Sequence, residues 1–225
     1  QFLSEHVNVL AAMLARHYHA PYELACLTDD PAGLDGSIEV YALPETKADW
    51  LGPPRHDTSK LFPACYRRLW LFSEEARELG VRLVQIDIDV VILQDITALI
   101  QGKTSPFVGW CDPASFSWSK VAGGFWALTS GSHPEIWEDF DVETSPAEAQ
   151  AAGNNGSDQS WLSYRLYPPK QSWTIRDGVY KLGWLRKAGQ RPPEDVRMVF
   201  FMGTAAPWHQ NIQIGHRWIL DYWHT

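Results

Sequence analysis

The chain has 225 residues, of which 45% are hydrophobic and 20% charged, and its formal net charge is −8. This length and composition suit one soluble globular domain with a sizeable core, and no apolar run reaches the roughly 18 residues of a membrane span. The negative charge argues against nucleic acid as a partner, because phosphate binding needs a basic face. Three cysteines, odd in number and widely spaced, predict reduced thiols and a cytoplasmic location.

The hydrophobic pattern predicts a chain of the α/β class. In chain order we expect a helix over residues 4–14, strands over 22–27 and 37–43, a loop over 44–58, a helix over 63–79, and strands over 81–93, 107–111 and 123–129. They are followed by a short helix over 135–140, a polar loop over 145–156, a helix over 158–166 that Asp158 could cap, and a last strand over 196–202. This order predicts a doubly wound sheet, although no strand precedes the first helix; we expect that strand upstream of Gln1, or lost.

Two carboxylates, Asp87 and Asp89, interrupt the apolar run over 81–93. Because side chains alternate along a strand, residues two apart point to the same face. Two negative charges beside a core are costly unless a positive group lies between them, and a divalent cation with oxygen ligands meets that need. The alternative is a strand end that meets water. The apolar residues on both sides of the pair favour the metal site.

Other polar residues end the expected strand over 22–27. Thr28, Asp29 and Asp30 follow it directly. In doubly wound sheets, ligands bind at the carboxyl ends of the strands. We therefore expect Thr28 and Asp30 to lie at the same ligand site as Asp87 and Asp89.

Five segments occur in an order typical of a known family. They are 66–69 (Tyr-Arg-Arg-Leu), 85–96 with the Asp-x-Asp (DXD) motif, 123–128 (Gly-Gly-Phe-Trp-Ala-Leu), 157–160 (Ser-Asp-Gln-Ser) and 201–208 (Phe-Met-Gly-Thr-Ala-Ala-Pro-Trp). This order resembles the A-type (GT-A fold) nucleotide-sugar glycosyltransferases, most closely the family-8-like group that includes glycogenin and bacterial galactosyltransferases. The resemblance covers roughly residues 4–210.

The resemblance implies a Rossmann-like GT-A fold, with a mixed central sheet and helices on both faces. It implies a single domain over 1–225, in which 1–100 bind the nucleotide sugar and 101–225 form the acceptor side and the C-terminal tail. The implied reaction moves a sugar, with retention of configuration, from a nucleotide sugar, most simply a UDP-sugar. The acceptor could be a glycan, a lipid-linked glycan, a protein or a small molecule, and the loops around 44–58, 110–120 and 145–156 are expected to select it.

The resemblance also implies roles for particular residues. Mn²⁺ or Mg²⁺ would bridge the diphosphate of the donor, with Asp89 as the main ligand and Asp87 on the metal, the donor ribose or both. Asp158 and Gln159 would contact the transferred sugar near its anomeric carbon, and Arg68 would lie near the diphosphate or the sugar. The donor site as a whole is expected to contain Thr28, Asp30, Arg68, Asp87, Gly124 and Gly203.

The sequence departs from the family at two positions near its end. Met202 stands where many members have a histidine that serves as third metal ligand, and Ala206 replaces a lysine that meets phosphate. A thioether is a poor ligand for Mn²⁺ or Mg²⁺. His209 could supply the third ligand if the segment folds back, or water could complete the shell. A weakly held metal, or altered or lost catalysis, is therefore expected.

Two other functions remain open from the sequence. Asp87 and Asp89 also fit the Asp-x-Asp of haloacid-dehalogenase-type phosphatases, as nucleophile and general acid. That motif normally follows the first strand of its domain, whereas about 80 residues precede it here. The second alternative is a non-catalytic, nucleotide-sugar-binding relic of the transferase fold, which Met202 and Ala206 favour.

Overall fold

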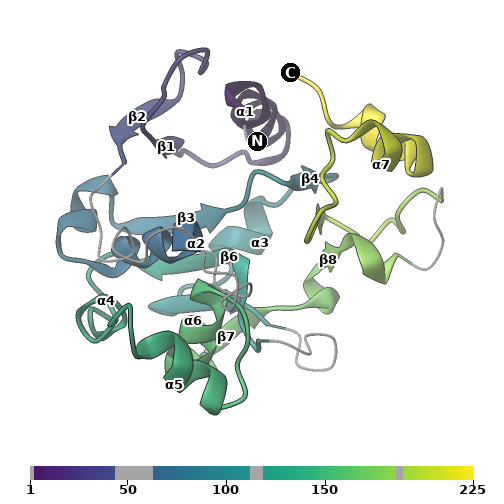
Figure 1. The fold of residues 1–225 in the computed structure, drawn as a ribbon. Coiled ribbons are helices and arrows are strands. Elements are labelled where there is room, and N and C mark those ends of the chain that lie inside the picture. The colour runs from purple at the N-terminus through teal and green to yellow at the C-terminus, as the bar shows by residue number, and fades with distance from the viewer. Residues whose placement is uncertain (1–2, 44–62, 112–118, 186–189) are drawn as a thin grey trace. The chain divides into compact units, whose positions relative to one another are not determined.

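The structure, a computed structural model, describes residues 3–43, 63–111, 119–185 and 190–225 (Figure 1). The chain folds as two compact units. Unit 1 consists of Gln1–Leu43, Ile86–Gly102 and Thr174–Thr225, and unit 2 of Pro44–Gln85 and Lys103–Trp173. These bounds differ from the successive halves 1–100 and 101–225, because the chain crosses between the units several times. The assignment of 1–225 to a single domain stays a prediction.

Unit 1 contains two small sheets and helix α1 (Ser4–His17). Strands β1 (Ala25–Thr28) and β2 (Glu39–Ala42) pair in parallel. The second sheet has the order β4-β9-β8, in which β9 (Met198–Phe200) pairs antiparallel with β4 (Val90–Ile92) and parallel with β8 (Val179–Lys181). The other described elements of unit 1 are α3 (Thr97–Gln101), α7 (Gln210–Gly215) and the 3₁₀ helices η5 (Ile175–Asp177), η6 (Leu182–Trp184) and η7 (Arg217–Asp221).

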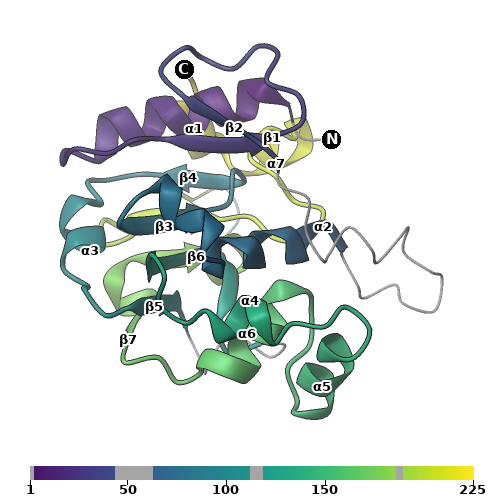
Figure 2. The same ribbon diagram turned by 90° about the vertical axis from the view of Figure 1, so that its left-hand side faces the viewer.

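Helix α1 lies along β4 (Figure 2). Its buried residues Val9, Leu10, Met13 and Leu14 recur at three- and four-residue spacing, which places them on one face of the helix. The Met13 sulfur accepts a hydrogen bond from the Ile92 amide at 3.4 Å. The expected helix at the start of the chain is therefore confirmed.

Unit 2 is built on a four-stranded sheet in the order β3-β6-β5-β7. Strand β5 (Phe107–Trp110) pairs antiparallel with β6 (Ala122–Thr129) and parallel with β7 (Gln171–Trp173), and β3 (Arg82–Ile86) lies at the other edge. The helical elements are α2 (Pro63–Tyr66), η3 (Arg67–Phe72), η4 (Glu75–Leu79), α4 (Glu135–Glu138), α5 (Ser145–Ala151) and α6 (Asp158–Leu166).

The core of unit 2 joins the helices to the sheet. Its buried side chains include Tyr66, Leu69, Phe72, Phe107, Trp126, Leu128, Ile136, Phe140, Trp161 and Leu162. Burying a large apolar side chain stabilises a fold by about 1.5–3 kcal/mol. This core therefore fixes η3 and α6, the two elements that carry Arg68 and Asp158.

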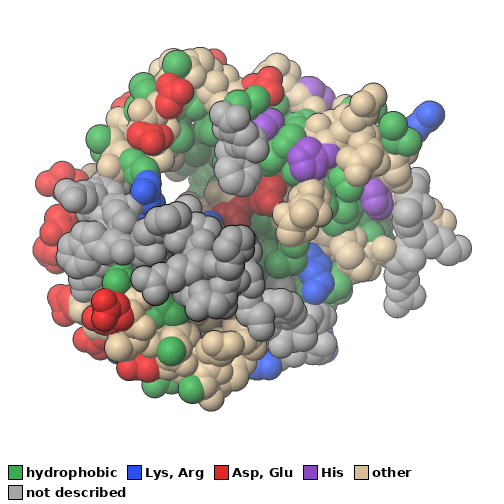
Figure 3. All heavy atoms as spheres, in the orientation of Figure 1, with side chains coloured by type: hydrophobic (Ala, Val, Ile, Leu, Met, Phe, Trp, Pro, Cys, Tyr) green, Lys and Arg blue, Asp and Glu red, His purple; other side chains and the backbone are tan. Residues whose placement is uncertain are grey.

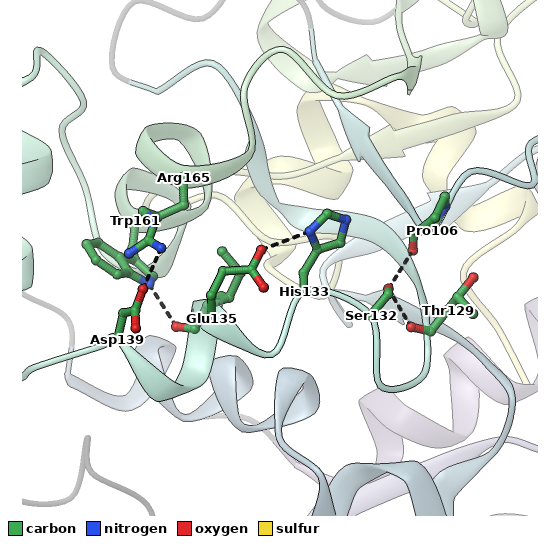
Figure 4. A network of polar contacts seen from close by, with 9 residues as sticks. Pro106, Thr129, Ser132, His133, Glu135, Asp139, Trp161 and Arg165 are labelled. Carbon is green, nitrogen blue, oxygen red and sulfur yellow. Dashed lines mark hydrogen bonds and ion pairs between the residues drawn. The ribbon is translucent and has the colours of Figure 1, made fainter.

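Hydrogen bonds also fix α6 against α4 (Figure 4). The Trp161 indole donates to the Ile136 carbonyl at 2.9 Å, and the Arg165 guanidinium donates to the Asp139 carboxylate at 2.6 Å. The Arg165 guanidinium also lies 4.9 Å above the Trp161 ring. The hydrogen bond from Trp161 satisfies a buried donor, so α6 packs on α4 in one preferred position.

Three sequence expectations differ from the structure. The single strand expected over 81–93 is two strands, β3 and β4, which belong to different sheets and are separated by a bend at 88–89. The helix expected over 63–79 is interrupted at Ser73, whose backbone is extended (φ −74°, ψ 164°). The loop expected over 145–156 contains the helix α5, with proline in its first turn, a position that proline favours.

The expected loop over 44–58 lies outside the described residues, as does most of the loop expected over 110–120. Within the described ranges, no helix is long and apolar enough to cross a membrane.

Candidate functional site

Arg68 joins three of the segments on which the resemblance rests. Its Nη1 donates to the Gly123 carbonyl of β6 at 2.7 Å, and its Nε lies 3.4 Å from Oδ2 of Asp158 at the start of α6. The Asp158 side chain is 3% exposed, whereas that of Arg68 is 23% exposed. The guanidinium thus offsets the charge of a buried carboxylate and still reaches the solvent, so it can contact an anionic ligand.

The second oxygen of Asp158 is held by its neighbour in the chain. The Ser157 hydroxyl donates to Oδ1 of Asp158 at 2.8 Å. Ser157 is the N-cap residue of α6, and Asp158 is the first residue of the helix. The expectation that Asp158 caps this helix is therefore wrong: its carboxylate sits in the first turn, where the helix dipole favours a negative charge.

Gly123 leaves the room that the ion pair needs. A Cβ at this position would lie 3.0 Å from Oδ2 of Asp158 and 3.3 Å from Nη1 of Arg68, closer than ordinary van der Waals contact. The sequence pointed to Gly124, which lies next to it in β6 and is half-buried. A glycine inside a strand often marks such a close approach, and this signal could have identified Gly123.

Gln159 is half-buried and lies against the backbone that leads into α6. A Cβ at Gly156, whose φ is +117°, would lie 2.5 Å from Nε2 of Gln159. The amide therefore packs against Gly156, whose backbone conformation only glycine adopts readily.

Tyr66 is a further buried polar group at this place, for which the sequence motifs indicated no role. Burial raises the pKa of its phenol, the Ser160 hydroxyl counteracts this in part, and the negative charge of Asp158 raises the pKa further. Tyr66 is therefore a neutral phenol near neutral pH. The Ser160 hydroxyl itself donates to the Ser157 carbonyl at 2.6 Å, so Ser157, Asp158 and Ser160 form one polar cluster, and the Tyr66 phenol lies near it.

In unit 1, the Asp-x-Asp motif lies beside the segment 201–208. The Asp89 carbonyl accepts a hydrogen bond from the Phe201 amide at 2.9 Å, which continues the pairing of Val90 with Phe200. Asp87 and Asp89 are half-buried; Asp87 directly follows β3 and Asp89 lies in the bend before β4, so the two do not lie on one face of a strand. The structure thus brings together two motifs more than 100 residues apart in the chain.

The expected third metal ligand is not found beside them. His209 is exposed at the start of α7, with its ring edge-on to Trp208, which in turn stacks on His6 at 3.9 Å between ring centroids. Figure 3 shows histidine side chains over α1 and α7. Among the residues that the structure describes, no three His, Cys, Asp or Glu side chains form a group that could hold a metal. Asp87, Asp89 and His209 are therefore not gathered as one site.

Thr28, Asp30 and Gly203 also belong to unit 1. Thr28 and Asp30 hold a local turn, because the Thr28 hydroxyl accepts from the Asp30 amide and the Asp30 carboxylate accepts from the Ala32 amide, both at 3.1 Å. Gly203 has φ +69°, and no described atom lies within 4 Å of the place where a Cβ would be, so a ligand could approach its backbone closely. Their contact with a donor stays a prediction.

Comparison with known proteins identifies the fold. No protein-family model and no curated protein matches the sequence. Many solved structures do match, among them galactosyltransferase LgtC in complex with donor and acceptor sugar analogs, at a TM-score of 0.62 and 13% identity, and an active-site glutamine-to-glutamate mutant of LgtC, at 0.65 and 14%. The first match covers 99% of this chain and 93% of LgtC, and the second 97% and 90%.

The chain has the fold of LgtC. The expected Rossmann-like GT-A fold, of the α/β class with mixed sheets, is thereby confirmed. At 13–14% identity the likeness to LgtC establishes the fold. The function has to be argued from the residues of this chain.

Proposed function

We propose that this protein is a glycosyltransferase that moves a sugar from a nucleotide-sugar donor, a UDP-sugar, to an acceptor hydroxyl. The observation that carries the proposal is the contact of Arg68 with both Gly123 and Asp158, in a chain with the LgtC fold. Three segments named for their resemblance to such enzymes thereby meet at one place. LgtC has been solved with donor and acceptor sugar analogs, and its active site includes a glutamine, the residue type found here beside Asp158.

The charges at this place suit the chemistry of sugar transfer. The anomeric carbon gains positive charge as the bond to the leaving group breaks, and a fixed carboxylate stabilises that charge. Asp158 supplies the carboxylate, and Gln159 can hydrogen-bond a sugar hydroxyl through its amide. The exposed part of Arg68 can bind diphosphate oxygens, since its guanidinium is already oriented by Gly123 and Asp158.

We propose that Asp87 and Asp89 bind Mn²⁺ or Mg²⁺ when the donor is present. Their carboxylate oxygens suit either ion, and both residues are half-buried and not fully enclosed, so an ion can reach them. No third protein ligand is found within the described ranges. Mg²⁺ is often held by one or two carboxylates with water and substrate phosphate, so this pair fits a metal that binds together with the donor. Such an ion would supply charge neutralisation for the leaving diphosphate.

We further propose that the configuration at the anomeric carbon is retained, as the resemblance implies. The anomeric signal of the product in a proton NMR spectrum decides this directly. An inverted product would leave the donor site intact but remove retention from the proposal.

A non-catalytic nucleotide-sugar-binding protein is the second candidate. It is favoured by Met202, by Ala206 and by the missing third ligand among the described residues. A haloacid-dehalogenase-type phosphatase has less support, because α1, β1 and β2 precede Asp87 and the fold is that of LgtC.

The test is a thermal-stability titration with Mn²⁺ and a panel of nucleotide sugars, followed by a transfer assay with any donor that binds. A ligand at 100 times its dissociation constant stabilises the folded protein by about 2.7 kcal/mol. A metal-dependent shift with one donor, lost in Asp89→Ala, supports the donor site. Release of the nucleoside diphosphate from that donor supports the enzyme, and binding without release supports the second candidate. No shift with any donor overturns both.

A further inference from the structure

Ser157 occupies a helix N-cap without capping the helix. Serine at this position usually accepts a hydrogen bond from the backbone amide two or three residues on. At Ser157 (φ −95°, ψ −129°) the side chain makes no such bond. Its hydroxyl donates instead to Oδ1 of Asp158 at 2.8 Å.

The hydrogen bond between Ser157 and Asp158 is buried, and a second hydrogen bond fixes the Ser157 backbone. Ser157 is 8% exposed and Asp158 2%. The Ser157 carbonyl accepts from the Ser160 hydroxyl at 2.6 Å, which fixes the peptide that carries the donor. A hydroxyl has a single proton to donate, so while the Ser157 hydroxyl donates to Asp158 it can donate to no other group.

The two oxygens of Asp158 therefore have different partners. Ser157 holds Oδ1, and the Arg68 guanidinium lies 3.4 Å from Oδ2. A carboxylate held at both oxygens cannot rotate about its terminal torsion without losing one of these contacts. Ser157 thus departs from the usual capping pattern of an N-cap serine at the place where the site needs a fixed carboxylate. Departures from local sequence–structure rules of this kind are common at functional sites.

We propose that Ser157 is a positioning residue, whose hydroxyl orients the Asp158 carboxylate for sugar transfer. This inference rests on the proposed function of Asp158. Its distinctive consequence is a division of effects: loss of the hydroxyl should slow turnover and leave donor binding almost unchanged, because misplacement of a reacting group acts mainly on the transition state.

The first test compares Ser157→Ala with Ser157→Thr. We expect Ser157→Ala to lower kcat about tenfold or more, with KM for the donor changed less than about twofold, and Ser157→Thr to restore most of the rate. The matched control is Ser145→Ala, which removes another buried serine hydroxyl of unit 2, one that accepts from the Asp141 amide at 2.9 Å. Equal losses of kcat in Ser157→Ala and Ser145→Ala, or none in Ser157→Ala, would overturn the proposal.

The second test needs no activity. The Tm of Ser157→Ala is measured in the natural chain and in an Asp158→Ala background. A hydroxyl that holds the carboxylate lowers Tm on removal only when Asp158 is present, by about 2–4 °C if the bond contributes as a typical hydrogen bond does. A hydroxyl that caps the helix lowers Tm equally in both backgrounds, which would overturn the proposal. A third outcome is that Ser157→Ala lowers Tm only when Asp158 is present while the protein turns over no nucleotide sugar. That pair of results would reject the proposed function and leave the orientation of Asp158 by Ser157 in place.

Discussion

The Arg68 guanidinium lies 3.4 Å from the buried Asp158 carboxylate and at the same time donates to the Gly123 carbonyl. Burial of a carboxylate is costly unless a partner offsets the lost hydration. The pair therefore has a structural role as well as the proposed functional one. Measurements of stability and of activity should separate the two.

Removal of the guanidinium should destabilise the protein. In Arg68→Ala, the Asp158 carboxylate stays buried and loses the positive charge beside its Oδ2 atom. We expect a loss of about 1.5–3 kcal/mol in the free energy of unfolding, the usual contribution of a hydrogen bond to a charged group, measured by urea denaturation. Donor turnover should fall with it.

The control is Arg191→Ala, which removes the exposed ion pair with Asp221, with side chains 66% and 55% exposed. Exposed pairs contribute between about 0 and 1 kcal/mol, so this variant should unfold almost as the natural chain does. Equal effects of the two substitutions would show that Arg68 is not a special partner of Asp158.

A methyl group at position 123 should disturb the pair without removing either charge. The added Cβ would lie 3.0 Å from Oδ2 of Asp158 and 3.3 Å from Nη1 of Arg68. Overpacking of this kind costs about 1–3 kcal/mol. We therefore expect Gly123→Ala to lower both Tm and turnover, whereas Gly183→Ala, where no described atom lies within 4 Å of the new methyl group, should change neither. Full activity in Gly123→Ala would contradict the proposed role of the Arg68–Asp158 geometry.

Some of this architecture was predictable from local sequence. Helix α1 has its apolar residues on one face, and α6 begins where the Ser-Asp-Gln-Ser segment indicates. The apolar run over 81–93, by contrast, predicts one long strand, because β-branched residues favour extended backbone throughout. The run is divided because its two parts pair with different strands: β3 pairs with β6, and β4 pairs with β9. Long-range pairing of this kind leaves no local signal.

The candidate site was predictable only in part, because contacts between distant residues leave no local signal in the sequence. The resemblance named Arg68 and Asp158 from their segments, and the structure brings them together. The roles of Gly123 and Ser157 depend on where other side chains point, so periodicity could not supply them. Among the described residues, Asp87, Asp89 and His209 do not form a group that could hold a metal, and the His209 ring lies edge-on to Trp208, whose ring is stacked on His6.

The His6 ring should make stability depend on pH. Burial lowers the pKa of His6 from its ordinary value of 6.5, a nearby Glu5 opposes the shift, and His209 adds to it. The unfolded chain then binds more protons than the folded one between the lowered pKa and 6.5. The contribution of His6 is therefore fully present above pH 6.5 and is lost as the pH falls below it.

His6→Asn tests this dependence. Its side-chain oxygen can replace Nδ1 of His6 as acceptor for the Leu3 amide, at 3.1 Å in the natural chain, but it does not titrate. We expect Tm to fall less steeply between pH 6.5 and 5 in this variant than in the natural chain. His224→Asn, at an exposed position, is the control and should leave the slope unchanged. A steeper fall in His6→Asn would mean that folding raises the pKa of His6 instead of lowering it.

A histidine at position 202, where many members of the resembled family have one, should strengthen metal binding. Met202 is 45% exposed, and it follows Phe201, whose amide donates to the Asp89 carbonyl at 2.9 Å. An imidazole suits Mn²⁺ far better than a thioether does, so Met202→His should bind Mn²⁺ about tenfold more tightly, measured by isothermal titration with donor present. Thr204→His places the same ring two residues further on, also at an exposed position, and should not have this effect. Equal affinity in the natural chain, Met202→His and Thr204→His would mean that the segment 201–208 does not face a metal held by Asp87 and Asp89. Tighter binding in Met202→His that disappears in the double variant with Asp89→Ala would place the ion between the two segments that the Asp89–Phe201 hydrogen bond joins.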